Sequence, residues 1–509
     1  MDILESPPGP TNSARQNTPR DSHDRRAVRW FAAVVVLCLA LRTTIAMQRD
    51  VICPDGAFFL RAAKMLAAGD PSLAFHRGFN VYPVILAELH ELGLDYEAAA
   101  KLWGLATSTL TLLPLWLLFR RQFGEPTAIV ACFLYAVHPG LAEWSVEPIR
   151  DSTFWLSFAT TLYFANRAAA SRGGIWILPT LTAFLVAVNL RTEGWFLAVP
   201  IAASFVAAVK GATTFFSDLG ILWWTVGASL SVALYLGAAA VSQESKTTDA
   251  AHLQVESPRP PTLPAAKRAS NYFKRLINGF HPLLGAFVLA GVYSQRRRLS
   301  TLEHGSLAMM NLLLLGSIWY YLRRYGDMNT RYFYPMVMTA LPYAAATLIR
   351  LIYRCRERLS GFALEPFVRP ATFCFLAIAG LTTAIFGGGD GRRREAELGR
   401  QIQSRFGAHL VVAEFGGHYL PAHYADARRL VTLSAPVGPL TYRQLKVERP
   451  ALIVLRGQAP ERACYREFLA LHSELGYEPV PTPDAELADA FDLYRLRTTV
   501  GGLNAALRR

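Results

Sequence analysis

A carboxylate and two cations follow the first long apolar run of this chain, within the segment CPDGAFFLRAAKMLAAGD at residues 53–70. Asp55 stands at the start of a stretch with helical spacing, and Arg61 and Lys64 lie three residues apart within it. An aspartate in that position suits two roles. It can cap the helix, or it can act as a general base that takes a proton from a nucleophile.

The same stretch has an apolar side. Phe58, Phe59, Ala62, Met65 and Leu66 fall broadly on one helical face, away from the two cations. Such a helix can lie in the membrane interface, with its aromatic side in lipid and its cations near headgroups or a lipid phosphate. The chemistry of this helix therefore depends on the membrane topology of the chain.

The chain is rich in apolar segments. Of its 509 residues, 52% are hydrophobic and 18% are charged, whereas about 25% are charged in ordinary soluble domains. Apolar runs lie near residues 30–47, 98–119, 126–141, 151–166, 175–190, 194–209, 219–241, 281–294, 305–321, 332–352 and 369–387. Because a membrane crossing needs about 20 apolar residues, we expect an α-helical polytopic membrane protein with about 11 transmembrane helices.

Cations mark one set of connections between these runs, as the positive-inside rule expects for the cytoplasmic face. With the N-terminus inside, these connections carry Arg120, Arg121, Arg167, Arg172, Lys210, Arg296, Arg297, Arg298, Arg350, Arg354, Arg356 and Arg358. They explain most of the net charge of +14, so we expect no nucleic-acid partner. The predicted location is the inner (plasma) membrane, with a cytoplasmic N-terminus.

The composition divides the chain into three parts. Residues 1–28 are polar and rich in Pro and Ser, and we expect them to be disordered and cytoplasmic. Residues 29–387 form the transmembrane domain, with large outer loops at 48–97 and 242–280. Residues 388–509 alternate strand-like and helical segments, so we expect a small extracytoplasmic α/β domain. Its predicted strands are 409–415, 429–436, 451–457 and 492–498.

Several charged residues lie on the predicted outer side, where arginine and lysine should be scarce. The cations are Arg61, Lys64, Arg77, Arg150, Arg191, Arg323, Arg324 and Arg331, and the acids are Asp55, Asp70, Glu143, Glu147, Asp151, Glu193 and Asp327. Charges this close to a bilayer are costly unless they are paired or in water. We interpret the cluster as a site in which arginine forks hold a phosphate. The alternatives are loop charges in solvent and, around residue 327, an internal ion-pair network.

Four segments in order, PDGAFFLRAAKMLAAGD, NVYPVILAEL, FLYAVHPGLAEWSVEPIRDSTFWLSFATTLYF and FLVAVNLRTEGWFLAVP, carry a resemblance to a known family. They resemble the GT-C membrane glycosyltransferases. The nearest branch is similar to the bacterial protein mannosyltransferases, of the dolichyl-phosphate-mannose-protein mannosyltransferase type, and the aminoarabinose transferases. The resemblance covers residues 30–210 well and is looser to about residue 390.

This resemblance implies a sugar donor on a polyprenyl phosphate, inverting transfer on the outer face, and an acidic base just after the first span. Asp55 matches that base. The family often has Asp-Glu where this chain has Asp55-Gly56, and the aminoarabinose branch has a lysine where Tyr82-Pro83 stands. Glu147, Arg150 and Asp151 match a second acidic loop, and Arg191 and Glu193 match an Arg-x-Glu-Gly turn. No DxD motif supports a metal site, and no cofactor is firmly predicted.

The expected function is transfer of a sugar from a polyprenyl-phosphate donor to an envelope acceptor, which is a lipid, a glycan or a protein. Asp55 is the expected catalytic residue, and the substrate-binding candidates are Arg61, Lys64, Arg77, Tyr82, Glu147, Arg150, Asp151, Arg191, Glu193, Arg324, Arg331 and Tyr332. Membrane lipids are the other expected partners. A transporter, which would carry charges near the midplane on broken helices, and a non-catalytic envelope scaffold on the same fold are the alternatives.

Overall fold

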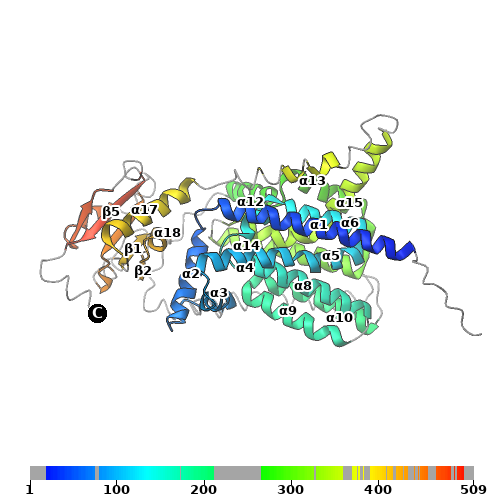
Figure 1. Ribbon diagram of the computed structural model, residues 1–509, viewed down its shortest axis with the longest axis horizontal. Coiled ribbons are helices and arrows are strands. Elements are labelled where there is room, and N and C mark those ends of the chain that lie inside the picture. The colour runs from blue at the N-terminus through cyan, green and yellow to red at the C-terminus, as the bar shows by residue number, and fades with distance from the viewer. Residues whose placement is uncertain are drawn as a thin grey trace, which may run out of the picture.

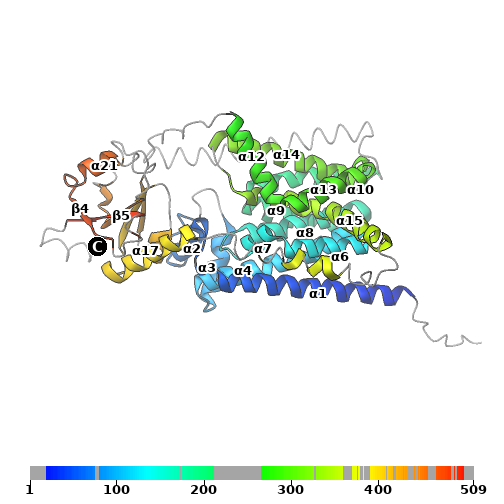
Figure 2. The same ribbon diagram turned by 90° about the horizontal axis from the view of Figure 1, so that it is seen from above.

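A helical bundle and a small sheet lie at opposite ends of a computed structural model, which describes residues 19–74, 80–171, 174–210, 265–325, 328–358 and, with short gaps, 370–497. The bundle helices run along the long axis of the molecule, and the C-terminal sheet lies beyond one end of them (Figures 1 and 2). The bundle is built from α1 (Pro19–Gln48), α4 (Tyr96–Leu110), α5 (Leu112–Phe123), α6 (Glu125–Val137), α8 (Asp151–Ser171), α9 (Ile177–Leu190), α10 (Ala198–Lys210), α13 (Pro282–Ser294), α14 (Leu302–Tyr325) and α15 (Tyr334–Arg358).

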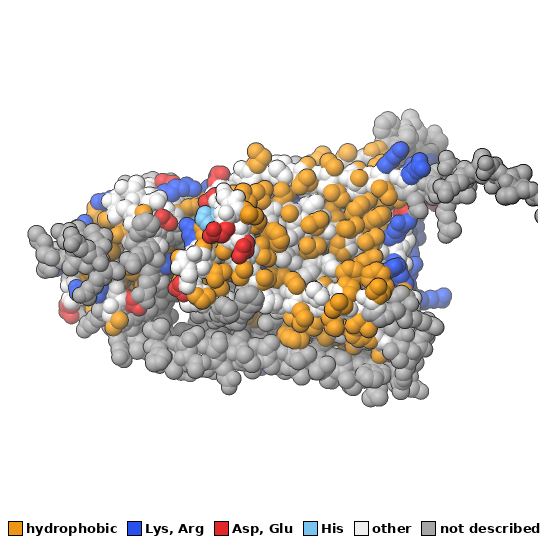
Figure 3. Space-filling model, turned by 60° about the horizontal axis from the view of Figure 1, so that its bottom comes forward, with side chains coloured by type: hydrophobic (Ala, Val, Ile, Leu, Met, Phe, Trp, Pro, Cys, Tyr) orange, Lys and Arg blue, Asp and Glu red, His pale blue; other side chains and the backbone are white. Residues whose placement is uncertain are grey.

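Apolar side chains cover the outside of this bundle as well as its core. Figure 3 shows a broad hydrophobic band over the bundle, with Lys and Arg side chains gathered at the end far from the sheet. An apolar exterior bounded by charge is the pattern of a membrane-spanning protein. Inside, one large hydrophobic cluster joins α1, α2, α4, α5, α6, α8, α13 and α15.

The helices follow the predicted apolar segments, but the expected number of spans is not confirmed. Four helices in the described residues are long and apolar enough to cross a membrane, or five if the bent pair 268–280 and 282–294 is one span. α6 and α9 have only 13 and 14 residues, fewer than the roughly 20 that a crossing needs. The predicted span at 219–241 lies outside the described residues.

Two polar segments are helical where the sequence suggested irregular chain. α1 begins at Pro19, inside the segment 1–28 that was expected to be disordered. The loop 242–280 ends in α12 (Ala265–Phe280), which meets α13 at an angle of 86°. The bend falls at His281, which has a positive φ of 63° and interrupts the helical hydrogen bonding.

Predicted inner connections meet at the basic end of the bundle. Arg298, in η3 (Arg296–Ser300), donates a 2.8 Å hydrogen bond to the carbonyl of Gln122 at the end of α5. The rings of Phe123 and His304 lie 4.9 Å apart. These contacts bring together two loops that the charge rule assigned to one side.

Short elements fill the other end of the bundle, between it and the sheet (Figure 2). They are α2 (Pro54–Ala67), α3 (Val81–Glu91), α7 (Pro139–Ser145), η2 (Thr192–Leu197) and η4 (Thr330–Phe333). A further 3-10 turn, η1 (Gly174–Trp176), joins α8 to α9. All the predicted outer connections that the structure describes therefore lead into one region.

The C-terminal residues form a five-stranded mixed sheet. Its strands are β1 (Val411–Phe415), β2 (Arg429–Leu433), β3 (Leu452–Arg456), β4 (Tyr477–Val480) and β5 (Phe491–Leu496), in the order β2-β1-β3-β5-β4. β1 pairs in parallel with β2 and β3, and β5 pairs antiparallel with β3 and β4. The helices α17 (Asp390–Phe406), α18 (Leu420–Tyr424) and α21 (Arg466–Leu471) accompany it. Four strands coincide with predicted segments, whereas β4 was missed because it is short and contains Pro479.

Candidate active site

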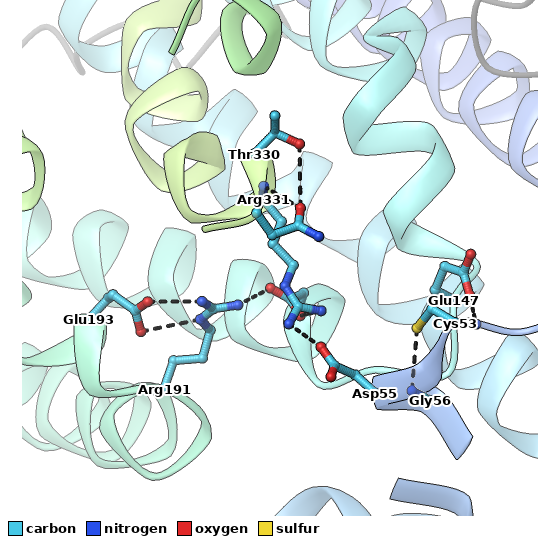
Figure 4. A network of polar contacts seen from close by, with 10 residues as sticks. Cys53, Asp55, Gly56, Glu147, Arg191, Glu193, Thr330 and Arg331 are labelled. Carbon is cyan, nitrogen blue, oxygen red and sulfur yellow. Dashed lines mark hydrogen bonds and ion pairs between the residues drawn. The ribbon is translucent and has the colours of Figure 1, made fainter. Parts of the chain in front are cut away.

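A chain of ion pairs links four of the predicted outer connections. Arg331 of η4 pairs with Asp55 of α2, and its Nη1 lies 3.8 Å from Oδ2 of Asp151. Asp151, at the start of α8, also pairs with Arg191. Arg191 in turn makes two hydrogen bonds to Glu193, of 2.8 and 3.2 Å. Figure 4 shows these side chains converging from separate elements.

Burial changes along this chain of ion pairs. The side chain of Asp151 is 3% exposed and that of Arg191 is 6% exposed, whereas that of Asp55 is 52% exposed. Buried charges stay ionised only when they are well paired, and Asp151 meets two guanidinium groups. The buried end is therefore fixed, and Asp55 is the carboxylate that a second molecule can reach.

Arg150 is the cation without a carboxylate partner. Its guanidinium lies over the ring of Phe59 at 5.6 Å, and no carboxylate of the described residues is within ion-pair distance. Burial and the nearby charge of Arg191 lower the pKa of Arg150 to about 10, so it is still protonated at neutral pH. The ion-pair chain holds three carboxylates and two guanidinium groups, and Arg150 adds a third guanidinium that pairs with none of them, so this guanidinium can take an anion.

Aromatic rings line the two inner arginines. The guanidinium of Arg191 lies 4.7 Å from the ring centre of Tyr332, and that of Arg331 lies 5.2 Å from that of Trp144. Tyr82 is fully buried in α3, where its ring meets Phe59 edge-on at 5.4 Å. Cation–π contacts of this kind hold guanidinium groups in place without neutralising them. Tyr332 thus belongs to the site, whereas Trp144 was not among the predicted site residues.

Cys53, and not Asp55, caps α2. The helix begins at Pro54, and the Cys53 Sγ accepts a hydrogen bond of 3.3 Å from the backbone N–H of Gly56. The capping role suggested for Asp55 was therefore wrong. Proline favours the first position of a helix because it needs no N–H partner there, and this signal at Pro54 was overlooked.

The first turn of α2 touches the loop between α7 and α8. A Cβ atom at Gly56 would lie 2.4 Å from Cγ of Pro148, so any larger residue must displace one of the two segments. The first turn of α2 and the loop before α8 therefore approach each other closely at Gly56.

The apolar side of α2 packs on protein, which corrects the expectation that its aromatic residues lie in lipid. Phe59 is 8% exposed and belongs to the main hydrophobic cluster. Lys64 lies 3.5 Å from Asp426 of the C-terminal sheet region. Together these contacts hold α2 between the bundle and the sheet.

Glu147 has both carboxylate oxygens occupied. Oε2 accepts from the backbone N–H of Cys53 at 2.7 Å, and Oε1 accepts from Nη1 of Arg392 at 2.6 Å. The Glu147 side chain is 3% exposed, and each of its oxygens accepts a hydrogen bond. We interpret it as a structural carboxylate that holds the segments of Cys53 and Arg392 together. Neither Arg392 nor Cys53 was among the predicted site residues.

The turn between α9 and η2 presents Arg191. The backbone of Arg191 is extended, and the N–H of Gly194 donates a 2.9 Å hydrogen bond to the Arg191 carbonyl. A Cβ at Gly194 would lie 2.7 Å from backbone atoms of Ala187 and Val188, so only glycine closes the turn. Arg77 and Asp327 lie outside the described residues, as does the side chain of Arg324, at the end of α14.

A family model described as dolichyl-phosphate-mannose-protein mannosyltransferase matches residues 81–236. The fold is similar to that of an oligosaccharyltransferase of Archaeoglobus fulgidus. The crystal structure of that protein in complex with Zn and sulfate superposes on this chain with a TM-score of 0.52. The expected resemblance to GT-C membrane glycosyltransferases is confirmed. The matched residues of this GT-C-like chain include Tyr82, Glu147, Arg150, Asp151, Arg191 and Glu193.

The archaeal structure is distant in sequence. It is 13% identical, and the alignment covers 83% of this chain and 68% of that one. The form of the same protein that is tethered to an acceptor peptide gives a TM-score of 0.51 at 12% identity, over 90% and 72% of the two chains. A mycobacterial arabinofuranosyltransferase, AftD, is less similar, with a TM-score of 0.47 at 13% identity over 92% and 42%. A comparison with curated protein sequences gave no significant match.

Proposed function

We propose that this protein transfers a sugar from a polyprenyl-phosphate donor to an acceptor at the membrane surface. The observation that carries the proposal is an exposed carboxylate, Asp55, paired with Arg331, which lies near two further arginines at one end of a membrane-spanning bundle. A polyprenyl donor lies in the bilayer, so its phosphate would meet the protein at that end. The resemblance to mannosyltransferases that use a dolichyl phosphate supports the same donor class.

The reaction would proceed in one inverting displacement. An acceptor hydroxyl oxygen attacks the anomeric carbon of the donor sugar while its proton passes to a carboxylate oxygen of Asp55. The bond from that carbon to the phosphate oxygen breaks, and its electron pair leaves with the polyprenyl phosphate. Arginines near that oxygen would stabilise the departing charge.

Donor binding would release the base. In the structure Asp55 is occupied by Arg331, whose Nε is buried without a hydrogen-bond partner among the described residues. A donor phosphate between Arg150 and Arg331 would draw Arg331 away from Asp55, because a fork of two N–H groups matches phosphate oxygens. Asp55 would then be free to accept a proton only when the donor is bound.

The carboxylates of the site do not fit a metal. Asp151 and Glu193 are already paired with arginines, and the described residues contain no group of three or more His, Cys, Asp or Glu that could hold an ion. The archaeal neighbour was crystallised with Zn, but no step proposed for this chain passes through a metal ion.

The transporter alternative fits less well. A transporter site is expected near the midplane of the membrane, whereas these charges belong to α2, the first residue of α8, the turn into η2, and η4, at the end of the bundle that faces the sheet. A non-catalytic scaffold would have no need for a carboxylate as exposed as that of Asp55 beside buried arginines. We therefore favour the transferase.

The test uses purified protein in vesicles and a panel of labelled polyprenyl-phosphate hexoses and pentoses. We expect one donor to be consumed by the wild type, with release of polyprenyl phosphate. Flux of a free sugar across the vesicle wall without donor cleavage would support a transporter. If no donor is cleaved and no sugar crosses the vesicle wall, the result would contradict the transferase and support a non-catalytic scaffold.

A further inference from the structure

The C-terminal region contacts the segment that leads into Asp55. Arg392, near the start of α17, donates to Glu147 at 2.6 Å, and the backbone N–H of Cys53 donates to the other oxygen of Glu147 at 2.7 Å. Glu147 thus joins residue 392 to residue 53 through one buried carboxylate. Cys53 caps α2 and lies two residues before Asp55.

A second contact fixes the neighbouring residue. The backbone N–H of Ile52 donates to the hydroxyl of Tyr424 at 3.1 Å, and the guanidinium of Arg400 covers the Tyr424 ring at 5.3 Å. Tyr424 belongs to α18, which packs on α17. Two consecutive backbone N–H groups, of Ile52 and Cys53, therefore depend on side chains that are held by the C-terminal region.

These contacts differ in strength. Lys64 and Asp426 are each more than 40% exposed, and exposed ion pairs contribute little. Arg392 and Glu147 are 27% and 3% exposed, and hydrogen bonds between charged, buried groups are the stronger kind. Although burial acts to lower it, the Glu147 carboxylate raises the pKa of Arg392. The Arg392–Glu147 pair is therefore the principal link.

The link reaches both sides of the site. Glu147 is followed by Pro148, which contacts Gly56, and then by Arg150 and Asp151. A shift of Glu147 would therefore move the start of α2 relative to the arginines. Arg392 bonds the C-terminal region to this loop through its ion pair with Glu147.

We propose that the C-terminal region positions Asp55 for catalysis, with Arg392 acting through Glu147 and the Cys53 backbone. Arg392 is a positioning residue, since it touches Glu147 and not the reacting groups. This inference rests on the proposed function for its catalytic consequence, but the holding of the α2 start does not depend on any substrate. The two parts can therefore be tested separately.

The first test measures the reactivity of Cys53. Its thiol is buried at the start of α2, so modification by N-ethylmaleimide, followed on the Cys53 peptide by mass spectrometry, reports opening of that turn. We expect Arg392→Ala to raise the modification rate about 10-fold or more, as for loss of one charged hydrogen bond. Arg392→Lys should restore part of the protection, and Arg393→Ala, on the exposed side of α17, should match the wild type.

The second test measures sugar transfer by the same variants. Arg392→Ala should lower kcat about 10-fold or more with little change in KM for the donor, because the arginines of the donor site remain in place. Unchanged Cys53 reactivity in Arg392→Ala would overturn the proposal whatever the transfer rate. Raised reactivity with unchanged kcat would overturn the positioning role alone. If the wild type transfers no sugar, the proposed function fails, and Cys53 reactivity still decides whether the C-terminal region holds this turn.

Discussion

Arg150 is the side chain on which donor recognition should depend most. The other two arginines of the site are already bonded to carboxylates, whereas the contact of Arg150 among the described residues is with the Phe59 ring. A phosphate that binds there gains a charge-assisted contact with Arg150, which itself has no ion pair to give up among the described residues. Loss of Arg150 removes that gain and leaves no buried carboxylate unpaired.

We therefore expect Arg150→Ala to raise the Kd for polyprenyl phosphate about 10-fold or more, as for one hydrogen bond to a charged group. The variant should remain folded, and Arg150→Lys should recover part of the affinity. Binding can be followed by titration of the purified protein with polyprenyl phosphate. Arg393→Ala is the matched control for the loss of one positive charge. Equal affinity of Arg150→Ala and the wild type would contradict this role.

The three site arginines were identified from the sequence because they depart from the positive-inside rule. Arginines at 150, 191 and 331 lie in connections that the charge rule assigns to the outer side, where cations are scarce. Their partners were not predictable in the same way, since Arg331 pairs with Asp55, which lies far from it along the sequence. Arg392 was not predicted as a site residue because 245 positions along the chain separate it from Glu147. A cationic run, GRRR at 391–394, does follow the last apolar segment on the predicted outer side. This run is the sequence feature that could have indicated Arg392.

At the scale of elements, the position of α2 depends on one glycine. In Gly56→Ala the new methyl group would meet Pro148, so the first turn of α2 or the loop before α8 must shift. Overpacking of this kind typically costs about 1–3 kcal/mol. We expect a melting temperature below that of the wild type and slower sugar transfer.

Gly285→Ala provides the control for this change. A Cβ at Gly285 makes only an ordinary contact of 3.7 Å with Phe280, and alanine favours a helix interior over glycine. This variant should keep the wild-type transfer rate and melting temperature or raise the latter slightly. Equal behaviour of the two variants would mean that the approach of Gly56 to Pro148 is not required.

The contact between α18 and α2 should weaken in acid. Burial, and then the charge of Lys64, lower the pKa of His423 to about 4; Asp426, Asp95 and Arg61 also face it. The unfolded chain takes up this proton below about pH 6.5 and the folded chain only near pH 4. Stability is therefore lost as the pH falls from 6.5 toward 4, by about 2 kcal/mol at pH 5.

The comparison of wild type with His423→Gln isolates this effect. Other histidines contribute equally to both proteins, so the difference between their melting temperatures should change from pH 7 to pH 5 in favour of the glutamine variant. The detergent-solubilised protein is suitable for the measurement. A difference that does not vary with pH would show that His423 is not held neutral.

Elements were predictable where the apolar pattern is long. The helices at 30–47, 305–321 and 332–352 and four of the strands were found in place, because each depends on a local period of hydrophobic residues. The start of α2, the extension of α1 to Pro19 and helix α12 were not found, since their sequences are polar and they are stabilised by packing. β4 depends on its neighbour β5 more than on its own composition.

The whole molecule joins a membrane bundle to a sheet through the candidate site. The basic end of the bundle lies opposite the end that faces the sheet region (Figure 3). Arrangement at this scale was predictable from charge alone, because cations and site residues alternate along the sequence. The packing of the sheet region on the start of α2 was not, because no pattern in residues 388–509 indicates which surface they meet.

The orientation of the whole protein in the membrane can be tested with reporter fusions. The cationic connections predict a cytoplasmic N-terminus and an outer C-terminal region. A reporter enzyme that is active only outside the cytoplasm, fused after residue 387, should therefore be active. A fusion after Arg121, in a predicted inner connection, should be inactive. The reverse result would place the site on the cytoplasmic face and remove the argument for its donor.

Asp55→Asn decides whether Asp55 takes the proton of the acceptor. Cys53 caps the helix, so the substitution leaves α2 capped. Asparagine has nearly the same shape but cannot serve as a base, so transfer from a polyprenyl-phosphate sugar should slow by about 10²- to 10⁴-fold. Donor binding should persist, and Asp70→Asn, at the exposed end of the same segment, should transfer at the wild-type rate. Near-normal transfer by a folded Asp55→Asn variant would contradict the account.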